Sequence, residues 1–188
     1  SAFNIKEQSL LLENFTLNQV QELYQQHTEE TGQAFSPEAL ELIFWYTRGQ
    51  PWLVNALGRE LCFGIHALPR EQTIETEPVK NAVEILIQRR DVHLDQLADK
   101  LTEPRVANVI QLILAGDTEE KILNLVSSED QQYLLDLGLI RKGEQGLEIA
   151  NPIYREVIPR ELTWVRQETL GQNPAWYVTG EGKLNLPK

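Results

Sequence analysis

Residues 139–151, LIRKGEQGLEIAN, decide the fold of this chain. Two short runs, LIRKG and LEIAN, alternate between apolar and polar residues, and the turn residues Glu144-Gln145-Gly146 join them. Alternation with a period of two is typical of strands, and a glycine-containing turn between two such runs indicates a β-hairpin. Because the segments before this stretch repeat with a helical period, the sequence predicts one small hairpin behind a series of helices.

The second half of the chain has the element order of a winged helix. Helices are expected at 92–102, 104–115, 118–126 and 128–137, followed by the hairpin and by a last helix from Pro152 to about Leu162. Pro104 and Pro152 stand where a helix tolerates proline best, in its first turn. Helices followed by a two-stranded hairpin therefore predict a winged-helix domain over residues 92–162, closed by an extra helix.

The first half predicts a bundle of four helices over residues 16–91. Cap residues separate the helices: Thr16, Gln19, Gly32, Ser36-Pro37, Gly49, Pro51 and Pro78. Thr16 and Gln19 have the spacing of a capping box, Ser36-Pro37 fits a helix start, and Gly32 and Gly49 fit helix ends. The third helix is expected to run from Pro51 to residue 68 and the fourth from Pro78 to about Arg90. The predicted fold class is mainly α: a four-helix bundle followed by the winged helix.

Two terminal segments lie outside these units. The leading segment, residues 1–15, contains the apolar run Ser9–Leu12, which fits a strand with no partner close in sequence. Its partner would be either the later hairpin or a sheet outside this chain. Residues 163–188 carry Gly171 and Pro174 and are interpreted as a linker or a surface clamp, anchored by Trp164 or by Trp176-Tyr177.

Composition excludes several function classes. The chain has 188 residues, 41% of them hydrophobic and 24% charged, and a net charge of -11, which disfavours non-specific nucleic-acid binding. It contains no apolar run of membrane-spanning length and no signal peptide. One cysteine, Cys62, excludes an internal disulfide and a thiolate zinc site, and fits a reducing cytoplasm. The absence of methionine suggests a piece of a longer polypeptide or a processed chain.

The sequence lacks the phosphate-binding signature of P-loop proteins. That signature is GxxxxGK followed by Ser or Thr, in which backbone N–H groups surround the phosphates. The nearest stretch, residues 180–184, lacks the upstream glycine and the hydroxyl that binds magnesium, and is interpreted as a polar turn. Asp136 follows apolar residues, as in a magnesium-binding strand, but the surrounding pattern is helical.

Other polar groups favour structural interpretations. Cys62 and His66 are spaced to touch on one helix, but apolar neighbours favour an inert thiol. His93, Asp95 and Asp99 suggest a metal cluster only weakly, since two carboxylates one turn apart usually form a solvated face. The group Arg89-Arg90-Asp91 fits a helix C-terminus with cations facing the dipole, and an arginine serving a neighbouring nucleotide site is the minority interpretation.

The predicted recognition helix does not suit DNA. Residues 128–137 carry three carboxylates and no Lys or Arg, so phosphates would be repelled, and Gln131 and Gln132 alone could contact bases. The hairpin adds only Arg141 and Lys142. The pattern favours a winged helix used for packing or protein contacts.

Several motifs resemble one family. The stretch TRGQPWLVNALGREL, residues 47–61, has a Gly-x-Pro opening a buried helix and resembles the region after the nucleotide-binding core of STAND/AAA+ P-loop ATPases. The stretches FNIKEQSLLLENFT, EETGQAF, GQPWLVNAL, ILIQRRDVHLDQLADKL, DLGLIR and ANPIYREVIPRELTW are similar to prokaryotic AAA-like ATP-binding proteins. In some of those a PD-(D/E)XK nuclease-like domain follows.

The resemblance implies roles for particular residues. Ser9–Leu12 would be the last strand of a missing core sheet, and residues 16–91 would be the helical lid. Gly49 and Pro51 match the Gly-x-Pro motif, whose proline in that class lies against the nucleotide. Residues 92–162 would relay nucleotide state to attached domains. Walker A, Walker B and the sensor residues would lie outside this chain.

The leading hypothesis is a non-catalytic lid and winged helix of a cytoplasmic AAA/STAND-type ATPase. Its parent would bind ATP or ADP with Mg²⁺, and this chain alone would bind neither tightly. The implied partners are the missing N-terminal P-loop core, a C-terminal effector domain and a protein partner, with no membrane and with DNA disfavoured. The alternatives are a free-standing winged-helix DNA-binding regulator and a protein–protein adaptor that uses the Trp-bearing tail.

Overall fold

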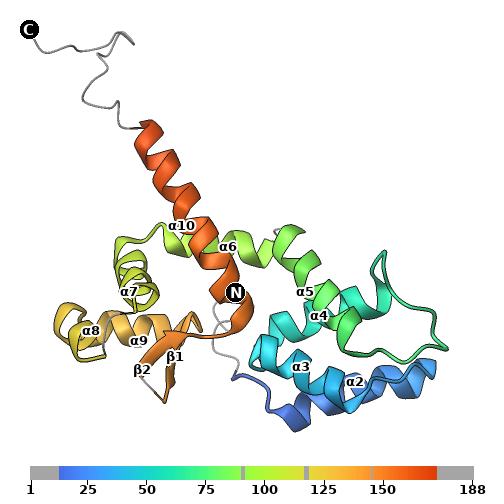
Figure 1. Ribbon diagram of the computed structural model, residues 1–188. Helices are drawn as coiled ribbons and strands as arrows, with labels where there is room; N and C mark the ends of the chain where they lie inside the picture. The colour runs from blue at the N-terminus through green and yellow to red at the C-terminus, as the bar shows by residue number, and fades with distance from the viewer. Residues whose placement is uncertain (1–12, 90–91, 117–118, 145, 173–188) are drawn as a thin grey trace, which may run out of the picture.

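A computed structural model describes residues 13–89, 92–116, 119–144 and 146–172 (Figure 1). The described chain is mainly helical, with one two-stranded antiparallel sheet, as the sequence predicts. The predicted strand at Ser9–Leu12 lies outside the described residues. Within the described part, no helix has the length and apolar character needed to cross a membrane.

The first two helices follow their cap signals. Helix α2 (Leu17–Thr31) begins with the predicted capping box: the Gln19 N–H donates to Thr16 Oγ1 at 3.3 Å, and the Thr16 N–H donates to Gln19 Oε1 at 2.8 Å. It ends at Gly32, which has φ +80°. Ser36 caps helix α3 (Pro37–Thr47) by accepting from the Ala39 N–H. These boundaries confirm the predicted signals at Thr16, Gly32 and Ser36.

Helix α4 (Pro51–Phe63) is shorter than predicted, because it ends at Gly64 and does not continue to residue 68. Gly64 is extended, and a Cβ on it would lie 2.4 Å from Glu60 Oε1. The buried Gln33 holds the loop that follows: its Nε2 donates to the carbonyl oxygens of Leu68, Pro69 and Gln72. Helix α5 (Thr76–Arg89) then begins two residues earlier than expected.

The second half has the predicted element order. It contains helices α6 (Val92–Leu101), α7 (Pro104–Leu114), α8 (Glu119–Leu125) and α9 (Ser128–Asp136) and strands β1 (Ile140–Gly143) and β2 (Gly146–Ile149). The strands pair antiparallel, with Ile140 opposite Ile149 and Arg141 opposite Glu148. The predicted hairpin is confirmed to within a residue or two at its ends.

Helix α10 (Pro152–Gln172) corrects the prediction for the C-terminal part. The last helix was expected to end near Leu162, but residues 163–172, interpreted as tail, continue it. The sequence has no stop signal after Leu162 until Gly171 and Pro174, so a mostly polar segment extends the helix. The proposed anchor Trp176-Tyr177 lies outside the described residues, as does the side chain of Trp164.

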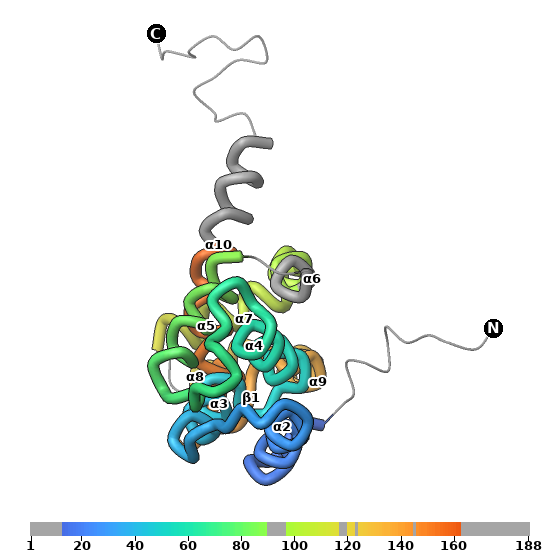
Figure 2. Tube along the Cα trace, turned by 90° about the vertical axis from the view of Figure 1, so that its right-hand side faces the viewer, coloured from blue at the N-terminus to red at the C-terminus, as the bar shows by residue number. Residues whose placement is uncertain are grey.

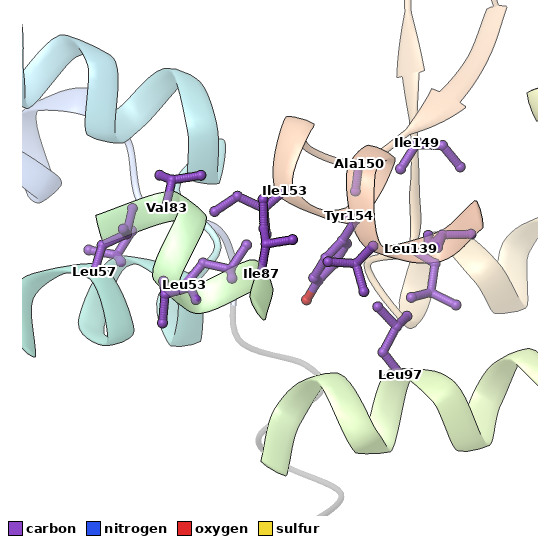
Figure 3. Packing of buried hydrophobic residues seen from close by; sticks show 14 of the residues in the cluster. Leu53, Leu57, Val83, Ile87, Leu97, Leu139, Ile149, Ala150, Ile153 and Tyr154 are labelled. Atoms are coloured by element: carbon purple, nitrogen blue, oxygen red, sulfur yellow. The ribbon is translucent and has the colours of Figure 1, made fainter. Parts of the chain in front are cut away.

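One buried cluster joins the two halves of the chain, and α10 lies at its centre. Helix α10 packs against α3, α5, α6 and β2. Figure 3 shows Ile153 beside Ile87 of α5, and Tyr154 near Leu97 of α6. Ile153 and Ile158 are fully buried. Figure 2 shows the same helices from the side; of those in the first half of the chain, α3 and α5 contact α10. The predicted domain boundaries at residues 16, 92 and 162 stay predictions.

Candidate functional site at the corner between α3 and α4

The Thr47 hydroxyl and backbone N–H groups of the corner, residues 47–51, are hydrogen-bonded within the protein. Thr47 is fully buried, and its hydroxyl donates to the Ile43 carbonyl at 2.8 Å and accepts from the Gly49 N–H at 3.2 Å. The Arg48 N–H donates to the Phe44 carbonyl at 2.7 Å. The buried Thr47 hydroxyl therefore stabilises the turn.

The chain turns through two left-handed residues at this corner. The sequence predicted Gly49 as the residue that ends α3, but the cap is Arg48, with φ +49°, and Gly49 follows with φ +73°. Arginine adopts this region at a cost that glycine avoids. Two consecutive left-handed residues reverse the chain so that α4 begins at once.

Gly49 is needed because the leading segment crosses directly over it. The Phe15 N–H donates to the Gly49 carbonyl at 2.8 Å. A Cβ on residue 49 would lie 1.9 Å from the Phe15 carbonyl oxygen, a distance that no side chain tolerates. The close backbone approach that the glycine permits is thus made by this chain's own leading segment.

Pro51 is the first residue of α4 and is partly exposed. Gln50 caps the helix by accepting from the Leu53 N–H at 2.7 Å, and the Pro51 carbonyl accepts from Asn55 Nδ2 at 3.0 Å. Proline suits this position because its missing N–H would have no partner there. The structure therefore buries Gly49 and leaves Pro51, two residues later, partly exposed.

Cys62 and His66, which the sequence analysis considered as a pair and interpreted as structural, do not form a reactive site. Helix α4 ends at Phe63, so His66 is not one helical turn from Cys62, and no hydrogen bond joins these two described side chains. Burial raises the pKa of the Cys62 thiol to about 11, which keeps it protonated at neutral pH. His66 lies instead beside Glu60 in a small cavity next to α5.

The arginine of the predicted helix end has a specific partner. Arg89 Nη1 lies 2.8 Å from Oε2 of Glu60, a carboxylate on α4 that is only 8% exposed. The side chains of Arg90, Asp91, His93 and Asp95 lie outside the described ones. In the described parts of the chain, no group of three His, Cys, Asp or Glu residues could hold a metal ion.

The helix that a DNA-binding winged helix would use for recognition carries internal hydrogen bonds. Gln131 Nε2 donates to the Val126 carbonyl at 3.2 Å, and Gln132 Nε2 donates to Asp136 Oδ1 at 2.8 Å. On the hairpin, Arg141 forms an ion pair with Glu148 on the neighbouring strand. The groups that were candidates for base contacts therefore already have partners.

The sequence did not point to three residues that make contacts with distant parts of the chain. Phe15, Gln33 and Glu60 lie far in sequence from the backbone or side chains that they contact. Only Glu60 gave a signal, as a carboxylate within the apolar third helix. Such a residue is rarely buried without a cationic partner.

Comparisons with known proteins add little to this description of the site. No family model and no curated protein matches the chain. Two solved structures from Thermotoga maritima are similar to it: the RuvB Holliday junction branch migration motor at 20% identity, and an arginine-to-alanine variant of RuvB at 19%. Each match covers 78% of this chain and 50% of that chain, with a TM-score of 0.39, so this chain spans about half their length. A TM-score this low does not establish a shared fold.

Proposed function

We propose that this chain is the helical lid and winged helix of an AAA/STAND-type ATPase, which senses nucleotide held by a P-loop core and relays its state to an attached domain or partner. The proposal starts from the Gly-x-Pro resemblance of residues 47–61. By itself the chain would be non-catalytic, and the parent protein would bind ATP or ADP with Mg²⁺ on the core.

The Phe15–Gly49 crossing is the observation that carries this proposal. A segment that leaves the last strand of a core must pass the lid at a defined point, and Phe15 is hydrogen-bonded to Gly49 at the corner. Pro51, two residues further on, is partly exposed at the start of α4. A nucleotide against Pro51 would therefore sit beside the junction between core and lid.

The packing of α10 supports the relay. This helix, which follows the hairpin, contacts α3 directly, and α3 ends at the corner. A shift of the corner would reach α10 and the hairpin through one continuous core, because packed interiors transmit displacement. The DNA-binding alternative has less support, since Gln131, Gln132 and Arg141 are already bonded within the protein.

Two measurements test the proposal. The first is the sequence of the native gene upstream of Ser1: we expect an in-frame extension of about 150–200 residues, a domain's length, that contains GxxxxGK followed by Ser or Thr. The second is a phosphate-release assay on the 188-residue chain, for which we expect no turnover of ATP. A start codon directly before Ser1, or ATP turnover that survives further purification, would overturn the proposal.

A further inference from the structure

We draw no further inference here: the strongest candidate, the surface patch at the C-terminal end of helix α4, where the apolar side chains of Phe63 and Ile65 are exposed, carries none because nothing in the structure shows what covers it.

Discussion

The corner between α3 and α4 and the groove at the start of α10 lie on one core but treat polar groups in opposite ways. At the corner, Thr47, Gly49 and Gln50 find their partners inside the protein, and the leading segment closes over Gly49. In the groove, which is lined by the end of α3, α5, the hairpin and the start of α10, Asn151 Nδ2 has no hydrogen-bond partner among the described residues, and Arg48 and Arg155 form no ion pair with them. The first arrangement stabilises the backbone of the turn, whereas the second leaves polar groups without internal partners. Substitutions should therefore cost more stability at the corner than in the groove.

The largest expected effect is at Gly49. Alanine there would meet both the left-handed φ of +73° and the Phe15 carbonyl 1.9 Å away, so Gly49→Ala should lower the free energy of unfolding by about 3 kcal/mol or more. Gly32→Ala is the matched control, since its φ is +80° with no atom within 4 Å, and should cost only about 1 kcal/mol. Urea unfolding followed by circular dichroism measures both. If both substitutions lowered the free energy of unfolding equally, the contact between Phe15 and Gly49 would contribute nothing to stability.

Next in size is the loss of a paired arginine. Arg89→Gln leaves the buried Glu60 without its cation and should cost about 2 kcal/mol. The double variant Arg89→Gln with Glu60→Gln should recover part of this loss, because no buried charge is then left unpaired. A double-mutant cycle in urea gives the coupling, and a value near zero would contradict the assigned pair.

A smaller loss is expected from Thr47→Val, which keeps the shape of the side chain but removes the hydroxyl. The Gly49 N–H then loses its partner, and unfolding should become easier by about 1–2 kcal/mol. Thr102→Val removes a hydroxyl on the exposed end of α6 and should stay within about 0.5 kcal/mol of the parent protein. If both variants unfold at the same denaturant concentration, the Thr47 hydroxyl does not stabilise the corner.

The smallest effect on stability belongs to the groove. Arg155→Gln removes an exposed cation that has no ion pair among the described residues, so the unfolding free energy should change by less than about 0.5 kcal/mol. This result would contrast directly with Arg89→Gln, the same substitution at a paired arginine. A loss of about 2 kcal/mol in Arg155→Gln would show that the groove is a structural contact, like the corner.

Most of the fold could be predicted from local signals. Thr16, Ser36, Pro51 and Pro104 each start a helix by chemistry that lies within a few residues, and the alternation in residues 139–151 is confirmed as a hairpin. The errors lie at two helix ends. Helix α4 ends at Gly64, a glycine within the apolar run that the sequence analysis read as helix, and Gln33 holds the loop that follows. Helix α10 continues past Leu162, where the sequence has no stop signal.

The candidate sites were less predictable than the fold. Gly49 and Pro51 could be identified from the sequence as helix boundaries, but the close approach to Gly49 is made by Phe15, thirty-four residues before it. The groove could not be inferred at all, because its lining comes from α3, α5, the hairpin and α10, which meet only in three dimensions. An orphaned donor such as Asn151 Nδ2 is a property of packing, not of sequence.

The most direct test of the proposed nucleotide-sensing role uses two prolines of the parent protein, extended upstream to include its core. Pro51 and Pro37 are each the first residue of a helix behind a side-chain cap, so alanine at either position perturbs its helix similarly. Binding of a fluorescent ADP analogue would be titrated in both variants. We expect Pro51→Ala to weaken binding about tenfold and Pro37→Ala to leave it unchanged. Equal affinities in the two variants would contradict the placement of nucleotide at the α3–α4 corner.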